Sequence, residues 1–291
     1  MNSSLRWSFL VLLLLFFSVA CLPSKKLTVG ATATLLEEVA KSSYKQSDLR
    51  VIREGMPAYL MLMDGMVEAV PDNPELLIVA AQGYSSFASV FIEDQDNEYA
   101  GLLFAKAKQY ALRSLEARGF RDSAEKPLDD FKKDLKTLGK KDLPYLFWGA
   151  SCWANWISLN LNSMEAMAQL PRVEWMMQRV LEIDEQFYYG GAHLFMGIWF
   201  ASRPKMAGGD LKKAQDHFLK AIHFGQEKFL MAYVYYANYY ARQARNKDLF
   251  LATLETVLKA PVDIFPDLTL MNAVAKKKAK ELLARAEEYF E

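Results

Sequence analysis

The pattern of apolar and polar positions has a helical period from about residue 35 to the end of the chain. Apolar residues recur every three or four positions, and no segment alternates as a half-buried strand does. Pro and Gly fall between the periodic segments, where they end helices. These breaks lie at Pro71–Pro74, Gly119, Ser202–Gly209, Ala260–Pro261 and Phe265–Pro266. The pattern predicts an all-α fold of consecutive antiparallel helix pairs.

A recurring spacing assigns the predicted helices to pairs. The first helix carries an aromatic residue or His, then an apolar and a small residue, then usually another aromatic: Tyr84, Phe87, Ala88, Phe91; Tyr145, Trp148, Gly149, Cys152; His193, Met196, Gly197, Phe200; Tyr233, Tyr236, Ala237, Tyr240. The second helix carries three spaced apolar positions: Ala100, Phe104, Ala107; Val173, Met177, Val180; Ala214, Phe218, Ala221; Phe250, Leu254, Val257. This order resembles the tetratricopeptide repeat (TPR), in which a small residue lets the two helices pack closely. We expect an α-helical solenoid of about four degenerate TPR-like helix pairs with flanking helices, and an irregular helical bundle is the alternative.

The first 21 residues have the pattern of an export signal. Arg6 precedes the apolar run Trp7–Phe17, and small residues then lead to Cys21. The run is shorter than the roughly 20 residues of a transmembrane anchor, which is the alternative. The approach to Cys21 resembles a bacterial lipobox, with Ser18 where a Leu is usual. Residues 1–20 are therefore predicted to be a signal peptide, residues 21–34 a tether lipidated at Cys21, and residues 35–291 a single TPR-like helical domain.

Acyl chains on Cys21 would hold the mature chain at a membrane surface. The residue after it is Leu22 and not the Asp that commonly retains lipoproteins at the inner membrane. We therefore expect a periplasmic location, anchored to the outer membrane more than to the inner one.

Composition narrows the function classes further. The formal net charge is zero, so the chain has no basic excess with which to neutralise the phosphates of a nucleic acid. Hydrophobic residues make up 52% of the chain, which is ample for a sizeable core. After Cys21 the sequence contains one more cysteine, Cys152, so the mature chain has no internal disulfide. Cys152 lies in an apolar stretch and is expected to be a small buried residue.

The sequence contains little that indicates catalysis, a cofactor or a metal. The acidic stretch Glu93–Glu98 lacks the ligand order of a calcium loop, and Asp96 or Asn97 is expected to cap the next helix. No two of His193, His217 and His223 are three or four residues apart, so no helix face offers a metal pair. We expect His193 to be a packed, hydrogen-bonded core residue. No phosphate loop or nucleophile elbow occurs. We therefore predict no enzyme activity, cofactor or metal, although a pair of distant carboxylates would leave no trace in the sequence.

Several short segments carry a closer resemblance than the repeat does. They are Gln82–Tyr84, Phe91–Asp96, Ala107–Leu115, Trp148–Trp153, Leu170–Glu174, His193–Gly197, Arg203–Pro204, Gly208–Gly209 and Lys228–Tyr240. In this order they resemble the TatT family, the T component of TPR-protein-associated TRAP transporters, over roughly residues 55 to 290. The resemblance implies a periplasmic TPR lipoprotein that forms a homotrimer and docks the substrate-binding P component of a tripartite ATP-independent transporter. A general envelope scaffold lipoprotein with TPR surfaces is the alternative function, and an exported hydrolase is a third.

A TPR stack places the first helix of each pair on its concave face. In the last three pairs the positions expected to face inward are mostly apolar: Leu143, Leu146, Trp153, Leu194, Ile198, Met231, Val234 and Asn238. Such walls would suit a hydrophobic small molecule. The alternative is that other segments cover the groove and that these side chains are core. Both interpretations stay open from the sequence.

Overall fold

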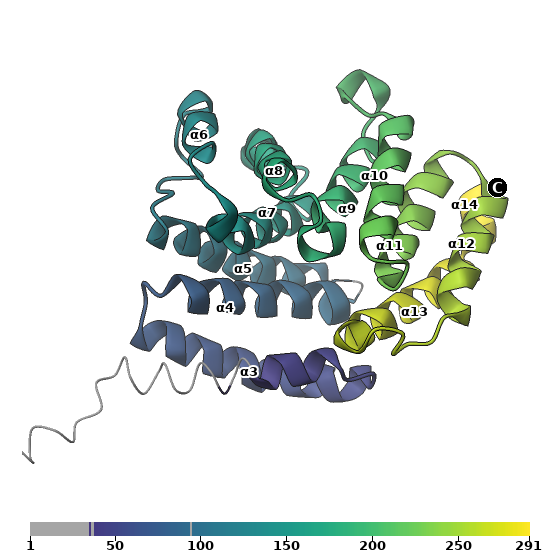
Figure 1. Ribbon diagram of the computed structural model, residues 1–291, viewed down its shortest axis with the longest axis horizontal. Helices are drawn as coiled ribbons and strands as arrows, with labels where there is room; N and C mark the ends of the chain where they lie inside the picture. The colour runs from purple at the N-terminus through teal and green to yellow at the C-terminus, as the bar shows by residue number, and fades with distance from the viewer. Residues whose placement is uncertain (1–34, 36–37, 94) are drawn as a thin grey trace, which may run out of the picture.

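The computed structural model describes residue 35, residues 38–93 and residues 95–291 (Figure 1). Within these residues the chain forms helices and no strand, which confirms the predicted all-α class. The predicted signal peptide and tether lie outside the described residues. A short helix over residues 38–44 comes before α3.

The α-helices that follow are α3 (Leu49–Ala69), α4 (Pro74–Phe87), α5 (Asn97–Ala117), α6 (Leu128–Leu135), α7 (Leu143–Ser158), α8 (Met164–Ile183), α9 (Phe187–Ala201), α10 (Leu211–Phe224), α11 (Leu230–Tyr235), α12 (Lys247–Lys259), α13 (Thr269–Ala284) and α14 (Ala286–Phe290). Two π-helices, η1 (Ala88–Ile92) and η4 (Tyr236–Ala241), continue α4 and α11. Short 3₁₀ turns are η2 (Lys140–Asp142), η3 (Lys205–Ala207) and η5 (Pro266–Leu268).

Local capping chemistry sets several helix ends at the predicted places. The Asn73 side chain accepts a hydrogen bond from the Leu76 N–H at 2.9 Å, and Pro74 occupies the first turn of α4, where its missing N–H costs nothing. Asp96 caps α5 in the same way through the Tyr99 N–H, also at 2.9 Å. The predicted capping role of the acidic stretch is therefore confirmed.

Helices that are consecutive in the sequence lie side by side. The packed pairs include α4 with α5, α7 with α8 and α9 with α10, and α5–α7 and α8–α9 contacts join one pair to the next. The stack curves, and α13 comes to lie beside α3 at the other end of the chain (Figure 1). An ion pair of 3.7 Å between Lys45 Nζ and Asp267 Oδ1 also joins these two ends. The curvature thus brings the N-terminal and C-terminal parts together.

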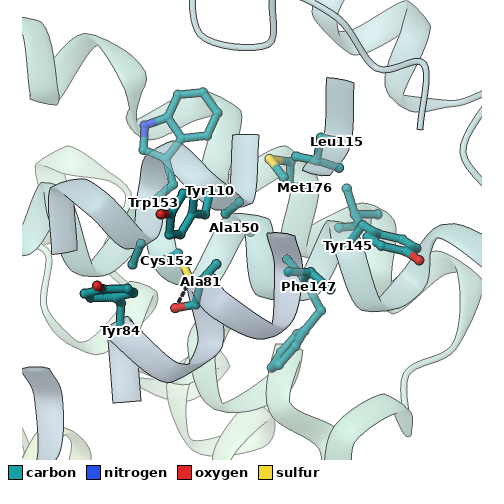
Figure 2. Packing of buried hydrophobic residues seen from close by; sticks show 14 of the residues in the cluster. Ala81, Tyr84, Tyr110, Leu115, Tyr145, Phe147, Ala150, Cys152, Trp153 and Met176 are labelled. Atoms are coloured by element: carbon teal, nitrogen blue, oxygen red, sulfur yellow. Dashed lines mark hydrogen bonds between the residues drawn. The ribbon is translucent and has the colours of Figure 1, made fainter. Parts of the chain in front are cut away.

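Two hydrophobic clusters fill the spaces between the helices, one from Leu60 to Trp199 and one from Leu194 to Ala286. Figure 2 shows part of the first, in which the Sγ of Cys152 points toward Ala81 and is 3.6 Å from its carbonyl oxygen. Burial raises the pKa of the Cys152 thiol to about 12. Cys152 is thus the buried, unreactive residue that the sequence predicted.

Two of the predicted small positions lie where neighbouring helices approach each other closely. A Cβ atom at Gly197 of α9 would be 2.9 Å from the ring of Phe218 of α10. One at Gly149 of α7 would be 2.9 Å from Leu115 Cδ1. Because real Cβ atoms do not come this close to a neighbour, each site requires glycine or a shift of its neighbour.

The segment Pro74–Ile92 is, among the described helices, one that is long and apolar enough to cross a membrane. It consists of α4 and η1, and α4 packs against α3, α5 and α7. More than half of it is buried inside the protein. These contacts are those of a core helix.

Candidate functional site

The eight predicted groove residues are mostly packed inside the protein. Ile198 and Asn238 are partly exposed, whereas the other six are buried: Leu143, Leu146, Trp153, Leu194, Met231 and Val234. The indole N–H of Trp153 donates to Gln169 Oε1 at 2.7 Å. Asn238 Oδ1 accepts a hydrogen bond from Arg242 at 2.6 Å. No described contact gathers the eight side chains around a common point, so their role as ligand contacts stays a prediction.

Six tyrosines from four parts of the chain do gather, and we call them the tyrosine cluster. They are Tyr44, Tyr59, Tyr188, Tyr189, Tyr235 and Tyr239. The first comes from the short helix before α3, and the second from α3 itself. The third and fourth lie in the first turn of α9, and the last two lie in α11 and η4. The cluster therefore depends on the curvature that joins the two ends of the stack.

The ring of Tyr188 lies 5.7 Å from that of Tyr189, and the ring of Tyr235 lies 5.9 Å from that of Tyr239, measured between centroids. The remaining phenols are close enough to affect the pKa values of these rings or of each other. Burial raises the pKa of Tyr188, and the neighbouring Tyr44, Tyr189 and Tyr235 raise it further. Burial raises the pKa of Tyr235 as well, with a smaller contribution from Tyr239. The pKa of Tyr59 rises to about 12 through burial and the proximity of Tyr44. All of these phenols are therefore neutral hydrogen-bond donors at pH 7.

The hydroxyl groups of the cluster have no hydrogen-bond partner among the residues that the structure describes. None of the six forms a hydrogen bond with another described residue, and none of the six side chains is fully buried. Buried tyrosines usually direct their O–H to a protein group, because an unmade hydrogen bond is costly. Phenols that are deep enough for raised pKa values and still partly accessible can donate to a bound molecule or to water.

Aromatic rings surround part of this cluster. The ring of Tyr188 lies 4.8 Å from that of Trp148 and 5.3 Å from that of Phe147, measured between centroids. Tyr189 contacts Phe229 at 5.7 Å. The cluster thus combines aromatic rings with hydroxyl donors, the mixture of apolar and polar groups that is usual in small-molecule sites.

Irregular backbone positions the tyrosines. Tyr188, Tyr189 and Gly190 all have positive φ values, of 49°, 57° and 72°. Two successive non-glycine residues in the left-handed region carry strain, which the surrounding packing must hold in place. Directly after them, a Cβ at Gly191 would meet the Phe147 ring at 2.6 Å. The tight packing of this turn holds the two tyrosines in the cluster.

Both π-helices lie next to the tyrosine cluster. Tyr239 belongs to η4, and Tyr235 comes immediately before it. Glu93 follows η1 and is close enough to raise the pKa of both tyrosines. Single π-helical turns inside α-helices occur frequently at functional sites. Three irregular segments of a regular helical stack therefore meet at one place.

The structure also pairs two of the histidines. His193, which is 2% exposed, lies in the core as predicted, and its Nδ1 is 2.8 Å from Nδ1 of His217 on α10. The sequence argument compared positions within a helix and therefore missed a pair formed between two helices. The described residues contain no group of three side chains that could hold a metal ion.

The sequence analysis missed the tyrosine cluster. Tyr235 and Tyr239 are four residues apart and come one position after Val234 and Asn238, which had been assigned to the groove. This spacing places both tyrosines on one helix face, so the sequence could have indicated that they belong to one site. The doublet Tyr188–Tyr189 and the distant Tyr44 offered no comparable signal.

Comparison with known proteins gives a family match. A family model described as the TRAP transporter T-component (TAtT) matches residues 45–290, which is most of the chain. This match confirms the resemblance found in the sequence. A search of curated proteins finds no match.

Proposed function

Because the chain belongs to the TRAP transporter T-component family, we propose that it is a non-catalytic binding and assembly subunit of a TRAP-type transport system. In this role it docks the substrate-binding P component and holds a hydrophobic ligand at the tyrosine cluster. The family supports involvement in transport, and the geometry of the cluster supports the ligand.

One observation carries the ligand proposal: the six tyrosines lie near one another, five of them half-buried and Tyr44 exposed, and none of their hydroxyls forms a hydrogen bond with a described residue. Aromatic rings beside them favour an apolar molecule, and neutral hydroxyls favour a hydrogen-bond acceptor on it. The ligand is therefore a mainly hydrophobic molecule with at least one acceptor group. Ile198 and Asn238, the two partly exposed groove residues, are further candidates for contacts.

The proposed membrane anchoring and oligomeric state follow from the sequence and from its resemblance to the family. A lipid on Cys21 anchors the protein at the periplasmic side of a membrane, the outer one in preference, and the protein assembles as a homotrimer. The tight helix crossing of Gly197 against Phe218 supports a TPR-like solenoid as the docking scaffold.

The ligand is tested by extracting the purified protein with organic solvent and analysing the extract by mass spectrometry. A variant with Tyr188→Phe and Tyr235→Phe keeps both rings and removes two donors, so it should retain the fold and lose most of the extracted ligand. A control with Tyr99→Phe and Tyr240→Phe removes two hydroxyls outside the cluster and should keep the ligand. Equal ligand in both variants would refute the site.

Docking is tested by sedimentation of the purified protein with a TRAP-type substrate-binding protein from the same organism. The expected result is a complex larger than either component. If no complex forms at micromolar concentration, the general scaffold function becomes the better explanation.

A further inference from the structure

A pocket lies where α13 passes beside the start of α3. Its volume is about 530 Å³. Lys276, Lys277, Lys280 and Glu281 of α13 line one side. The opposite side includes Ser47, which comes just before α3, and Leu49, its first residue.

The lining carries an excess of positive charge. Three lysines face one carboxylate, and Lys277 Nζ is 3.7 Å from Glu281 Oε1. Lys276 donates to the Leu258 carbonyl oxygen at 2.7 Å, a contact that leaves its charge uncompensated by a carboxylate. Lys280 is exposed and forms no ion pair or hydrogen bond with another described residue. Because the whole chain has a net charge of zero, this is a local excess and not a property of the entire surface.

Apolar side chains complete the pocket. Leu49, Val262 and Ala273 line it, and Ile264, two residues after Val262, is exposed in the same loop. Lysines beside exposed aliphatic groups are the combination that binds a membrane interface, since the ammonium groups contact phosphates and the aliphatic groups contact the upper acyl region.

The pocket is also at the end of the molecule where the chain comes from its predicted anchor. Ser47 follows the short helix of residues 38–44, and the tether from Cys21 leads into that helix. A lipid at Cys21 would keep this end near a bilayer and raise the effective concentration of headgroups around it.

We propose that the pocket between α3 and α13 docks on anionic phospholipid headgroups and so orients the anchored protein on its membrane. The proposal rests on the membrane attachment proposed above. The recognised chemistry is a phosphate group held by Lys277 and Lys280, and the source to which we commit is the lipid surface.

The test uses the processed lipoprotein reconstituted in vesicles and labelled with acetic anhydride, with the modified lysines identified by mass spectrometry. In vesicles of phosphatidylcholine and phosphatidylglycerol, labelling of Lys277 and Lys280 should fall about fivefold relative to phosphatidylcholine alone, as expected for roughly 1 kcal/mol per lysine. High salt should remove this protection. Three exposed lysines near α6, Lys133, Lys136 and Lys140, lie far from α13 and should be labelled equally in both (Figure 1).

Other outcomes overturn the proposal. Equal labelling of Lys277 and Lys280 in the two vesicle types would show that the pocket does not contact the lipid. Protection by free inorganic phosphate in phosphatidylcholine vesicles would identify a soluble anion as the occupant. A protein that fails to sediment with either vesicle type lacks the anchor, and that result contradicts the membrane attachment separately from the pocket.

Discussion

His193 and His217 face each other across the contact between α9 and α10, with their Nδ1 atoms 2.8 Å apart. On the other side of the first ring, His193 Nε2 lies 3.2 Å from Glu185 Oε2. Lys220 Nζ is also 3.2 Å from this carboxylate oxygen. With both rings neutral, His193 can donate to Glu185 and accept from His217, and each hydrogen bond is satisfied. Protonation of both rings would place two donors and two charges at the Nδ1 contact.

This pair predicts a loss of stability in mild acid. Burial lowers the pKa of His217 to about 4, with further lowering by His193 and Lys220, and burial also lowers the pKa of His193. Since both values lie below the ordinary one of about 6.5, the unfolded state binds more protons as the pH falls. The stability that the two neutral histidines contribute is fully present above pH 6.5 and is lost as the pH falls towards 4. The free energy of unfolding should fall by about 1 to 2 kcal/mol between pH 7 and pH 5.

Urea unfolding at a series of pH values measures this effect. His217→Gln should reduce the fall in the free energy of unfolding between pH 7 and pH 5. His223→Gln, a change at an exposed position, should leave this pH dependence as in wild type. An unchanged slope in His217→Gln would mean that other groups cause the dependence.

Replacing glycine with alanine should have opposite effects on stability at Gly197 and at Gly65. Gly197→Ala places a Cβ 2.9 Å from the Phe218 ring and should lower the free energy of unfolding by about 1 to 3 kcal/mol. Gly197→Leu should cost more. Gly65→Ala, inside α3, meets nothing within 4 Å and should stabilise by about 0.5 to 1 kcal/mol, because alanine favours the helix. Thermal or urea unfolding of both variants checks the pair, and a neutral Gly197→Ala would disprove the tight crossing.

A polar network predicts the effect of neutralising Asp64 on α3. Its carboxylate accepts hydrogen bonds from the hydroxyls of Tyr84, at 2.7 Å, and Tyr110, at 2.8 Å, and forms an ion pair with Lys106. Asp64→Asn removes the charge and should lower the free energy of unfolding by about 2 kcal/mol. Tyr84→Phe removes one neutral donor and should cost about 1 kcal/mol. Urea unfolding at neutral pH distinguishes the two, and equal losses would argue against a role for the Asp64 charge.

Lipidation of Cys21 predicts a clear labelling result. A radioactive fatty acid fed to the producing cells should label the wild-type protein and leave Cys21→Ser unlabelled. Cys152→Ser is the matched control and should be labelled as wild type is. Label in Cys21→Ser would disprove attachment through this residue.

The sequence alone determined the helices, many of their ends and some of the contacts between neighbours. Asn73, Pro74 and Asp96 act through bonds to residues a few positions away, so their effect is present in any helical fold. The close packing of α10 against α9 at Gly197 followed from the repeat, because adjacent helices joined by a short loop have few ways to pack. The family, too, followed from short segments in order along the chain.

The tertiary structure alone decided which side chains meet at the site. Tyr44 approaches Tyr188 because small rotations between successive helices add up along the stack, and no local pattern encodes that sum. Val234 lies in the core and Tyr235 in the cluster because one residue turns a helical side chain by about 100°, so a register error of one position selects a different face. The left-handed turn at Tyr188 and Tyr189 is held by packing against distant residues and not by local preference.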